Sequence, residues 1–89
     1  MLKISQAGSV NGIVTLKVEG RLVGPWVGEL RKACEFILRE GRTLKLDLAD
    51  VSYVDDKGVA VLTDFRSRGA ELQNHSPFVD AQLKAPMSN

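Results

Sequence analysis

At the centre of the chain stands the run LKLDLADVSYVDDKGV, residues 44–59. Its first part alternates leucine with Lys45 and Asp47, which predicts a strand with one buried face. The alternation stops after that, and we expect Ala49–Lys57 to form a loop. A helix is predicted from about Lys57 to Arg68, with an inner face at helical spacing made of Val59, Leu62 and Phe65.

Upstream of this run, the sequence predicts a hairpin and a helix. Asn11-Gly12 is the strongest hairpin signal, because a type I′ turn needs positive φ at both central positions. Strands are expected on either side, a short one from Leu2 and a second over Val14–Glu19. Gly20–Gly24 is expected to be a loop, and Pro25 suits the first turn of a helix that ends at Gly41. The apolar side of that helix consists of Trp26, Leu30, Ala33, Cys34, Ile37 and Leu38.

Downstream of the run, the signals are weaker. Ala70–His75 is a short strand candidate. Ser76-Pro77 predicts an N-cap followed by proline at the first position of a last helix. We expect this helix to fray into Pro86–Asn89 and to have an inner face made of Phe78, Val79 and Leu83.

The order of these elements predicts an α/β fold. The sheet is expected to be small, mixed and four-stranded, with an N-terminal β-hairpin and about three helices in the order β-β-α-β-α-β-α. One helix connects strand Val14–Glu19 to strand Thr43–Leu48, so these two strands should be parallel. Their carboxyl ends then share one edge, where sites form in open α/β sheets. The 89 residues leave room for one domain, residues 1–89.

The composition excludes several classes of function. Twelve basic residues oppose eleven acidic ones, and the two signs are mixed along the chain, which argues against a nucleic-acid binder. A single cysteine allows no internal disulfide, and the first residues contain no apolar signal region. No apolar run is long enough to cross a membrane. We therefore expect a cytoplasmic protein that is not inserted into a membrane.

Residues 44–59 resemble the signature of the STAS domain, a family named after sulphate transporters and anti-sigma-factor antagonists. The family's motif is a strand with an acidic residue, a loop with hydrophobic positions, and then Asp-Ser-Ser/Thr-Gly at the start of a helix. Asp55 matches the motif aspartate and Gly58 the motif glycine. Residues 69–79 also resemble the passage that follows the second helix of the family. The resemblance implies a STAS-like fold and a regulatory domain that binds a kinase-like anti-sigma factor.

The sequence departs from the family at the regulatory position. In the family, phosphorylation of a serine at the helix start turns docking off, and Lys57 occupies the position of that serine. Lysine has no hydroxyl, so we expect no phosphorylation within Asp55–Gly58. Asp56 carries one negative charge against about −1.5 to −2 for phosphoserine, and the neighbouring Lys57 weakens even that mimicry. A simpler role for Asp56 is that of N-cap of the second helix.

The resemblance also implies a partner-binding surface at the start of the second helix. We expect partner contacts at Asp55, Asp56, Lys57, Gly58, Thr63 and Trp26. The expected partner is a protein, either an anti-sigma kinase-like protein or the ATPase of a transporter to which the domain belongs as a subunit. A nucleotide or anion sensor is a further alternative, because Lys57 would suit a phosphate. No cofactor is expected, and the chain is expected to be a monomer or weak homodimer.

Three other groups are more easily explained by structural roles than by chemistry. The carboxylates of Asp47, Asp50, Asp55 and Asp56 fit no EF-hand spacing, so capping and solvation are expected rather than a metal site. Cys34 lies on an apolar helix face and is expected to be buried and structural, while His75 is expected to be solvated. Trp26 fits core packing as well as a partner contact. Without a nucleophile and base at a defined spacing, we expect no enzyme.

Overall fold

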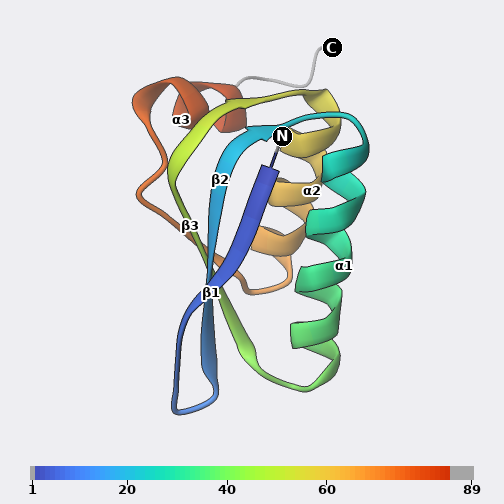
Figure 1. The fold of residues 1–89 in the computed structure, drawn as a ribbon, viewed down its shortest axis with the longest axis vertical. Coiled ribbons are helices and arrows are strands. Elements are labelled where there is room, and N and C mark those ends of the chain that lie inside the picture. Colours follow the sequence, from blue (N-terminus) through green and yellow to red (C-terminus); the bar gives the residue numbers. More distant parts are fainter. Residues whose placement is uncertain (1, 85–89) are drawn as a thin grey trace.

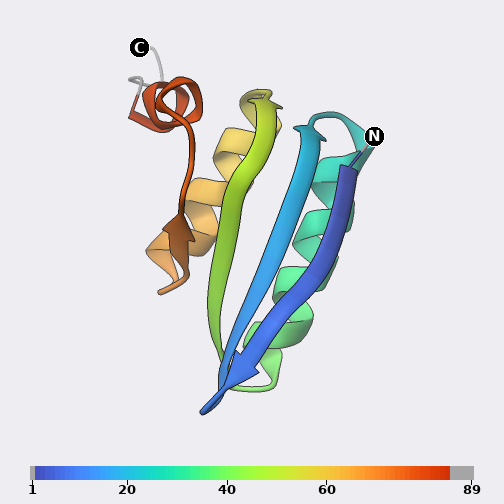
Figure 2. The ribbon, with the colours of Figure 1, turned by 60° about the vertical axis from the view of Figure 1, so that its left-hand side comes forward.

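The computed structural model describes residues 2–84 as a single sheet with two helices against one face (Figures 1 and 2). The strands are β1 (Leu2–Val10), β2 (Ile13–Leu22), β3 (Thr43–Val54) and β4 (Glu71–Gln73), in the spatial order β1-β2-β3-β4. The helices are α1 (Pro25–Arg39), α2 (Asp56–Ser67) and α3 (Pro77–Lys84). β1 pairs antiparallel with β2, and the other two pairings are parallel. The predicted fold class and element order are confirmed; the expected fraying over Pro86–Asn89 lies outside the described residues.

The turn between β1 and β2 has the geometry that its sequence predicts. Asn11 and Gly12 have φ values of 54° and 79°, as a type I′ turn requires. The strand that begins at Leu2 is longer than the short one we expected, since it reaches Val10. Its pairing with β2 shifts by one residue between Gln6 and Gly8. The hairpin thereby places β1 at one edge of the sheet.

Two predicted loops are strand in the structure. Residues 20–22 and 49–54 were expected to be loop, yet Gly20 pairs with Val51 and Leu22 with Val54. The pairing shifts between Lys17 and Glu19 and again between Gly20 and Arg21, and these irregularities interrupt the alternation of side chains that a strand normally shows. The parallel pair β2–β3 therefore extends right up to the start of α2.

The core lies between the sheet and the two long helices. Alternate residues of β2 and β3 are buried, as their sequence pattern predicts, and Phe65 of α2 is fully buried among them. In α3, Val79 and Leu83 are buried as expected. Phe78 was expected on the inner face, but 55% of it is exposed. α3 packs against β3 and α2, and the Gln82 amide donates to the backbone oxygen of Val54 at 2.6 Å.

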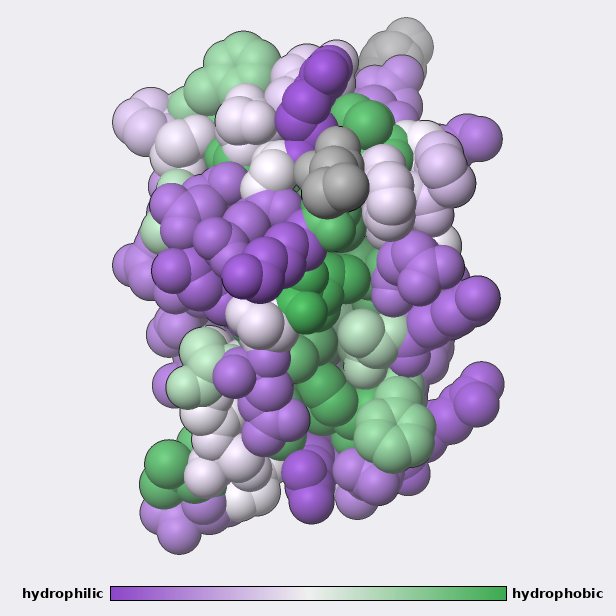
Figure 3. All heavy atoms as spheres, viewed as in Figure 1, coloured by the Kyte–Doolittle hydropathy of each residue, from purple (hydrophilic) through white to green (hydrophobic). Residues whose placement is uncertain are grey.

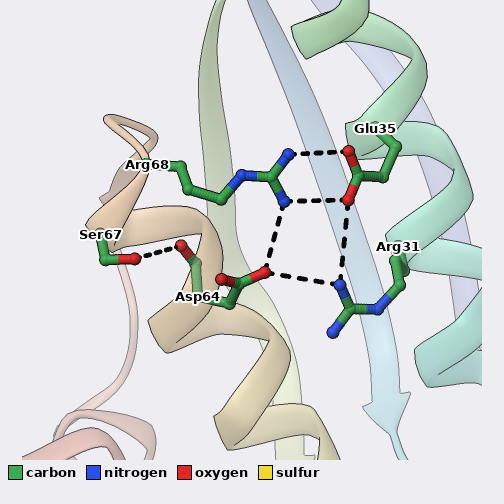
Figure 4. Close-up of polar contacts among 5 residues, drawn as sticks. All are labelled: Arg31, Glu35, Asp64, Ser67 and Arg68. Atoms are coloured by element: carbon green, nitrogen blue, oxygen red, sulfur yellow. Dashed lines mark hydrogen bonds and ion pairs between the residues drawn. The ribbon is translucent and has the colours of Figure 1, made fainter.

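A network of charged side chains connects α1 to α2 on the outer surface (Figure 4). Arg68 donates to both carboxylate oxygens of Glu35, at 2.8 and 2.9 Å, and contacts Asp64 at 3.3 Å. Arg31 contacts Asp64 at 3.4 Å. Both guanidinium groups also lie over the ring of Phe65. These contacts join the outer surfaces of α1 and α2.

Candidate functional site

Asp55 joins the end of the sheet to the starts of both long helices. Its backbone N–H donates to the oxygen of Leu22 at 3.2 Å. One carboxylate oxygen accepts from the N–H of Gly24 at 2.9 Å, and the other accepts from the N–H of Gly58 at 2.8 Å. Asp55 is therefore the N-cap of α2, and the expectation that Asp56 fills this role is wrong. α2 begins at Asp56, so the cap is the residue before it.

These backbone donors also set the charge state of Asp55. The N–H of Gly24, aided by that of Gly58 and by the nearby charge of Lys57, holds the pKa of the Asp55 carboxyl below its usual value. The ionised form is the one that accepts both hydrogen bonds. Asp55 thus supplies a fixed negative charge at the positive end of the α2 dipole.

Gly58 is at this position because α2 starts very close to the sheet. Gly58 is buried, and a Cβ at this position would lie 2.6 Å from a methyl group of Val54 and 2.8 Å from the backbone oxygen of Leu22. Its backbone is helical, so close packing rather than a positive φ excludes a side chain. Gly58 shapes the site but offers no side chain to a partner.

Asp56 and Lys57 are exposed at the edge, and Thr63 is exposed two turns further along α2. All three side chains are exposed on α2. Asp56 and Thr63 are seven residues apart, close to two helical turns, so they lie on the same side of the helix. Lys57 stands beside Asp56, and the two opposite charges make a local dipole on the surface. The structure places Asp56 and Lys57 side by side at the start of α2 and Thr63 about 10 Å further along the helix.

Trp26 takes a different position from these residues. It is half-buried and packs against the core near the start of α1. Trp26 lies seven residues, about two turns, before Ala33, so the two residues are on the same side of α1. Ala33 lines a hollow beside β1. The side of α1 that faces α2 is a different one, which carries Arg31 and Glu35. Trp26 therefore lies on the β1 side of α1, and the structure does not place it on the exposed face of α2.

An aromatic group at the same end of the sheet was missed by the sequence reasoning. The rings of Tyr53 and Phe78 are 6.1 Å apart, and the guanidinium of Arg21 lies 5.6 Å from the centre of the Tyr53 ring. Tyr53 and Phe78 are both exposed. The pairing of Arg21 with Tyr53 depends on a register shift that the sequence does not signal. Phe78 was missed because its helical spacing predicts an inner position.

The other candidate groups have structural roles. Asp47 accepts from the N–H of Ala49 at 3.0 Å, and Asp50 pairs with Lys17 at 3.2 Å. No three His, Cys, Asp or Glu side chains within residues 2–84 gather in a way that would hold a metal ion. Cys34 is fully buried as expected, and this burial raises the pKa of its thiol to about 12.

His75 is less exposed than we expected. Instead of being solvated, its side chain is 24% exposed, and its Nε2 lies 3.0 Å from the carboxylate of Asp80 in α3. Ser76 caps this helix as predicted, accepting from the N–H of Val79 at 3.1 Å. The turn before α3 is thus held by packed polar contacts.

None of the helices described within residues 2–84 has the length and apolar character needed to span a membrane.

Comparison with known proteins identifies a family model that matches the chain and a solved structure with a similar fold. A family model described as the STAS domain matches residues 5–79. Among solved structures, the chain is similar to the anti-sigma factor antagonist SpoIIAA in its unphosphorylated form, with a TM-score of 0.73 and 19% sequence identity. The match covers 92% of this chain and 82% of that one. At this identity the likeness shows the fold alone. A search of curated proteins found no match.

Proposed function

The chain belongs to the STAS domain family, and we therefore propose that it is a non-catalytic regulatory domain that binds a protein partner through the start of α2. The observation that carries the proposal is the anchoring of this edge by Asp55. Hydrogen bonds to Gly24 and Gly58 hold the ends of β2 and β3 and the start of α2 in one geometry. The backbone of such an edge is already fixed and loses little conformational freedom on binding, which favours a recognition surface.

The proposed partner surface consists of Asp56, Lys57 and Thr63 on α2, and the exposed rings of Tyr53 and Phe78 lie at the same end of the sheet. Exposed aromatic residues beside charged ones are typical of protein interfaces. An anti-sigma kinase-like protein is the partner class that the likeness to an anti-sigma factor antagonist favours. The ATPase of a transporter is the second class, and the same edge serves both.

A phosphate or nucleotide fits this edge less well. A helix N-terminus binds anions through its free N–H groups, but the N–H of Gly58 already donates to Asp55. The ionised carboxylate also places negative charge where the anion would lie. The Asp55 cap therefore speaks against the anion-sensor alternative and in favour of a protein.

The serine switch of the family has no hydroxyl to act on in Asp55–Gly58. We expect that incubation with ATP and a cognate kinase adds no phosphate to this segment, and peptide mapping by mass spectrometry checks this. Ser52 and Tyr53 carry exposed hydroxyls just before this segment, and the Ser52 hydroxyl donates to the oxygen of Gly20 at 3.4 Å. Phosphate found on Ser52 in cells would contradict the view that binding is unswitched.

Affinity capture in the native host tests the proposed role. Tagged wild type is compared with the double variant Asp56→Lys/Lys57→Asp, which keeps the net charge but reverses the local dipole. A matched control reverses an exposed pair elsewhere, Lys45→Glu/Glu71→Lys, whose charged groups lie 3.9 Å apart between β3 and β4. We expect one partner to be captured by wild type and control and lost with the Asp56/Lys57 variant. Equal capture by all three would place the partner surface elsewhere.

A further inference from the structure

The side of α1 that faces β1 leaves apolar surface exposed, at a distance from the edge described above. A hollow of about 480 Å³ separates β1 from α1, and Figure 3 shows an apolar strip along this part of the molecule. Its apolar lining comes from the inner face of the hairpin and from α1: Ile4, Val14, Leu16, Ala33, Phe36 and Ile37. The hollow thus continues the core out to the surface.

Phe36 is the most prominent side chain of this face. It is 65% exposed, although it is one of the largest apolar residues of the chain. It lines the hollow beside β1 and also a second one of about 460 Å³ on its other side, whose remaining lining residues are all charged: Arg31, Lys32, Glu35 and Arg39. Phe36 is therefore a ridge with a hollow on each side. A ridge next to a hollow on one surface is what a self-complementary, two-fold contact requires.

The charges around Phe36 have the matching symmetry. Lys32 lies one helical turn before Phe36 and Glu40 one turn after it, on the same side of the helix. An antiparallel copy of α1, related by a two-fold axis at Phe36, therefore brings Lys32 of each chain opposite Glu40 of the other. Within one chain, Lys32 has a contact of 3.8 Å to Glu29, and Glu40 one of 3.6 Å to Arg42; the Lys32 side chain is 80% exposed and that of Glu40 42%.

We propose that a second copy of this chain covers this face, with the two α1 helices packed antiparallel about an axis at Phe36. The two Phe36 rings pack against each other and cover part of the hollow beside β1 in each chain, and two Lys32–Glu40 pairs form across the axis. The contact uses one helical stripe per chain, which places it among small interfaces, so the dimer is weak. The start of α1 is about 16 Å along the helix from Phe36, so the α2 edge stays open in the dimer.

Sedimentation equilibrium at low salt, from about 1 μM to 1 mM protein, measures this association directly. We expect wild type to dimerise over this range and Phe36→Ala to associate at least about tenfold more weakly, since a central aromatic carries much of a small interface. Phe78→Ala is the matched control, because Phe78 is also an exposed phenylalanine but lies on α3. The control should associate like wild type.

A charge exchange tests the register of the contact. Lys32→Glu and Glu40→Lys each place like charges opposite one another in a homodimer, so each variant alone should associate more weakly than wild type. An equal mixture of the two variants restores both pairs across the axis, so we expect the mixture to associate as strongly as wild type. Lys32 and Glu40 are two turns apart within one chain, so recovery in the mixture cannot come from an internal pair.

Three results would overturn the proposal: monomer throughout the concentration range, unchanged association of Phe36→Ala, or no recovery in the mixture. Binding of a different protein to this face, competing with self-association and lost in Phe36→Ala, would replace the second copy as its occupant. The Asp56→Lys/Lys57→Asp variant should dimerise like wild type, which keeps this test separate from that of the proposed function.

Discussion

Asp55 illustrates at the residue scale how one side chain organises a functional edge. Its carboxylate accepts hydrogen bonds from two segments that are distant in sequence, Gly24 and Gly58, and its backbone N–H donates to Leu22. The ionised state suits both the two donors and the dipole of α2. Asp55 thus acts on the surface indirectly, by positioning Asp56 and Lys57.

Replacing Asp55 with alanine should lower the free energy of unfolding at pH 7 by about 1–2 kcal/mol, the range for loss of an N-cap. The pKa of Asp55 is lowered in the folded protein, so its contribution is complete above the unfolded pKa of about 3.9 and disappears as the pH falls through the folded pKa. The difference between wild type and variant should therefore shrink below about pH 4. Urea unfolding at pH 7 and pH 3 measures this, with the exposed Asp56→Ala as control. A difference that does not change with pH would contradict this role of the charge.

Two helical glycines give a matched pair for the packing at the site. Gly58→Ala forces a methyl group to within 3 Å of Val54 and of the oxygen of Leu22, and we expect a loss of about 1–3 kcal/mol of stability. Gly28→Ala in α1 meets nothing within 4 Å, and should stabilise the protein by about 0.5–1 kcal/mol through helix propensity. Chemical denaturation of both variants checks the prediction. Equal effects would mean that α2 does not start as close to the sheet as described.

Single residues also show what the sequence could reveal. Gly58 was identified as the motif glycine, and the close contacts that a Cβ would make with Val54 and Leu22 explain why a glycine stands there. The N-cap was placed one residue late because Asp55 and Asp56 are chemically identical candidates, and the structure distinguishes them by the start of α2 and by the hydrogen bond from Gly58 to Asp55. The ring of Phe78 was misplaced because helical spacing gives the faces of a helix but not what covers each face.

At the scale of elements, the parallel pair β2–β3 determines where the site forms. Both strands continue beyond the predicted ends, and this brings Leu22 and Val54 side by side under the start of α2. The sequence predicted the parallel pairing and the shared edge from the connecting helix. It did not predict the extra strand residues, because irregular pairing interrupts the alternation on which the prediction relied.

The charged network between α1 and α2 should couple these helices in a salt-dependent way. Arg68 makes a bidentate contact with Glu35 and lowers the pKa of that carboxyl, so the pairing is fully present above the unfolded pKa of glutamate and lost as the pH falls. A double-mutant cycle of Glu35→Ala and Arg68→Ala should give a favourable coupling energy at pH 7 that falls at high salt.

The matched control for this cycle is the pair Lys3–Glu19, whose groups lie 4.0 Å apart with Lys3 largely exposed. Its coupling should be close to zero. If the Glu35–Arg68 cycle also gives no coupling at low salt, the network of Figure 4 does not hold the two helices together.

At the scale of the whole molecule, the two proposed binding surfaces lie on different parts of the molecule, one at the start of α2 and one on the β1 side of α1. We propose that the start of α2 binds a protein partner and that the β1 side of α1 binds a second copy. A chain of 89 residues has little room for an enclosed cavity, and a function based on surfaces is consistent with that size. The fold class could be predicted from the order of elements in the sequence. The exposed face around Phe36 could not, because it depends on how the hairpin and α1 are placed relative to each other in the structure.

The most direct test of the proposed function is a calorimetric titration of the purified partner into wild type and into Asp56→Lys/Lys57→Asp. Both side chains are exposed, so the variant should unfold at nearly the same denaturant concentration as wild type. We expect its dissociation constant for the partner to rise at least about tenfold, which corresponds to about 1.4 kcal/mol. A folded variant that binds the partner with the affinity of wild type would contradict the assignment of the start of α2 as the binding edge.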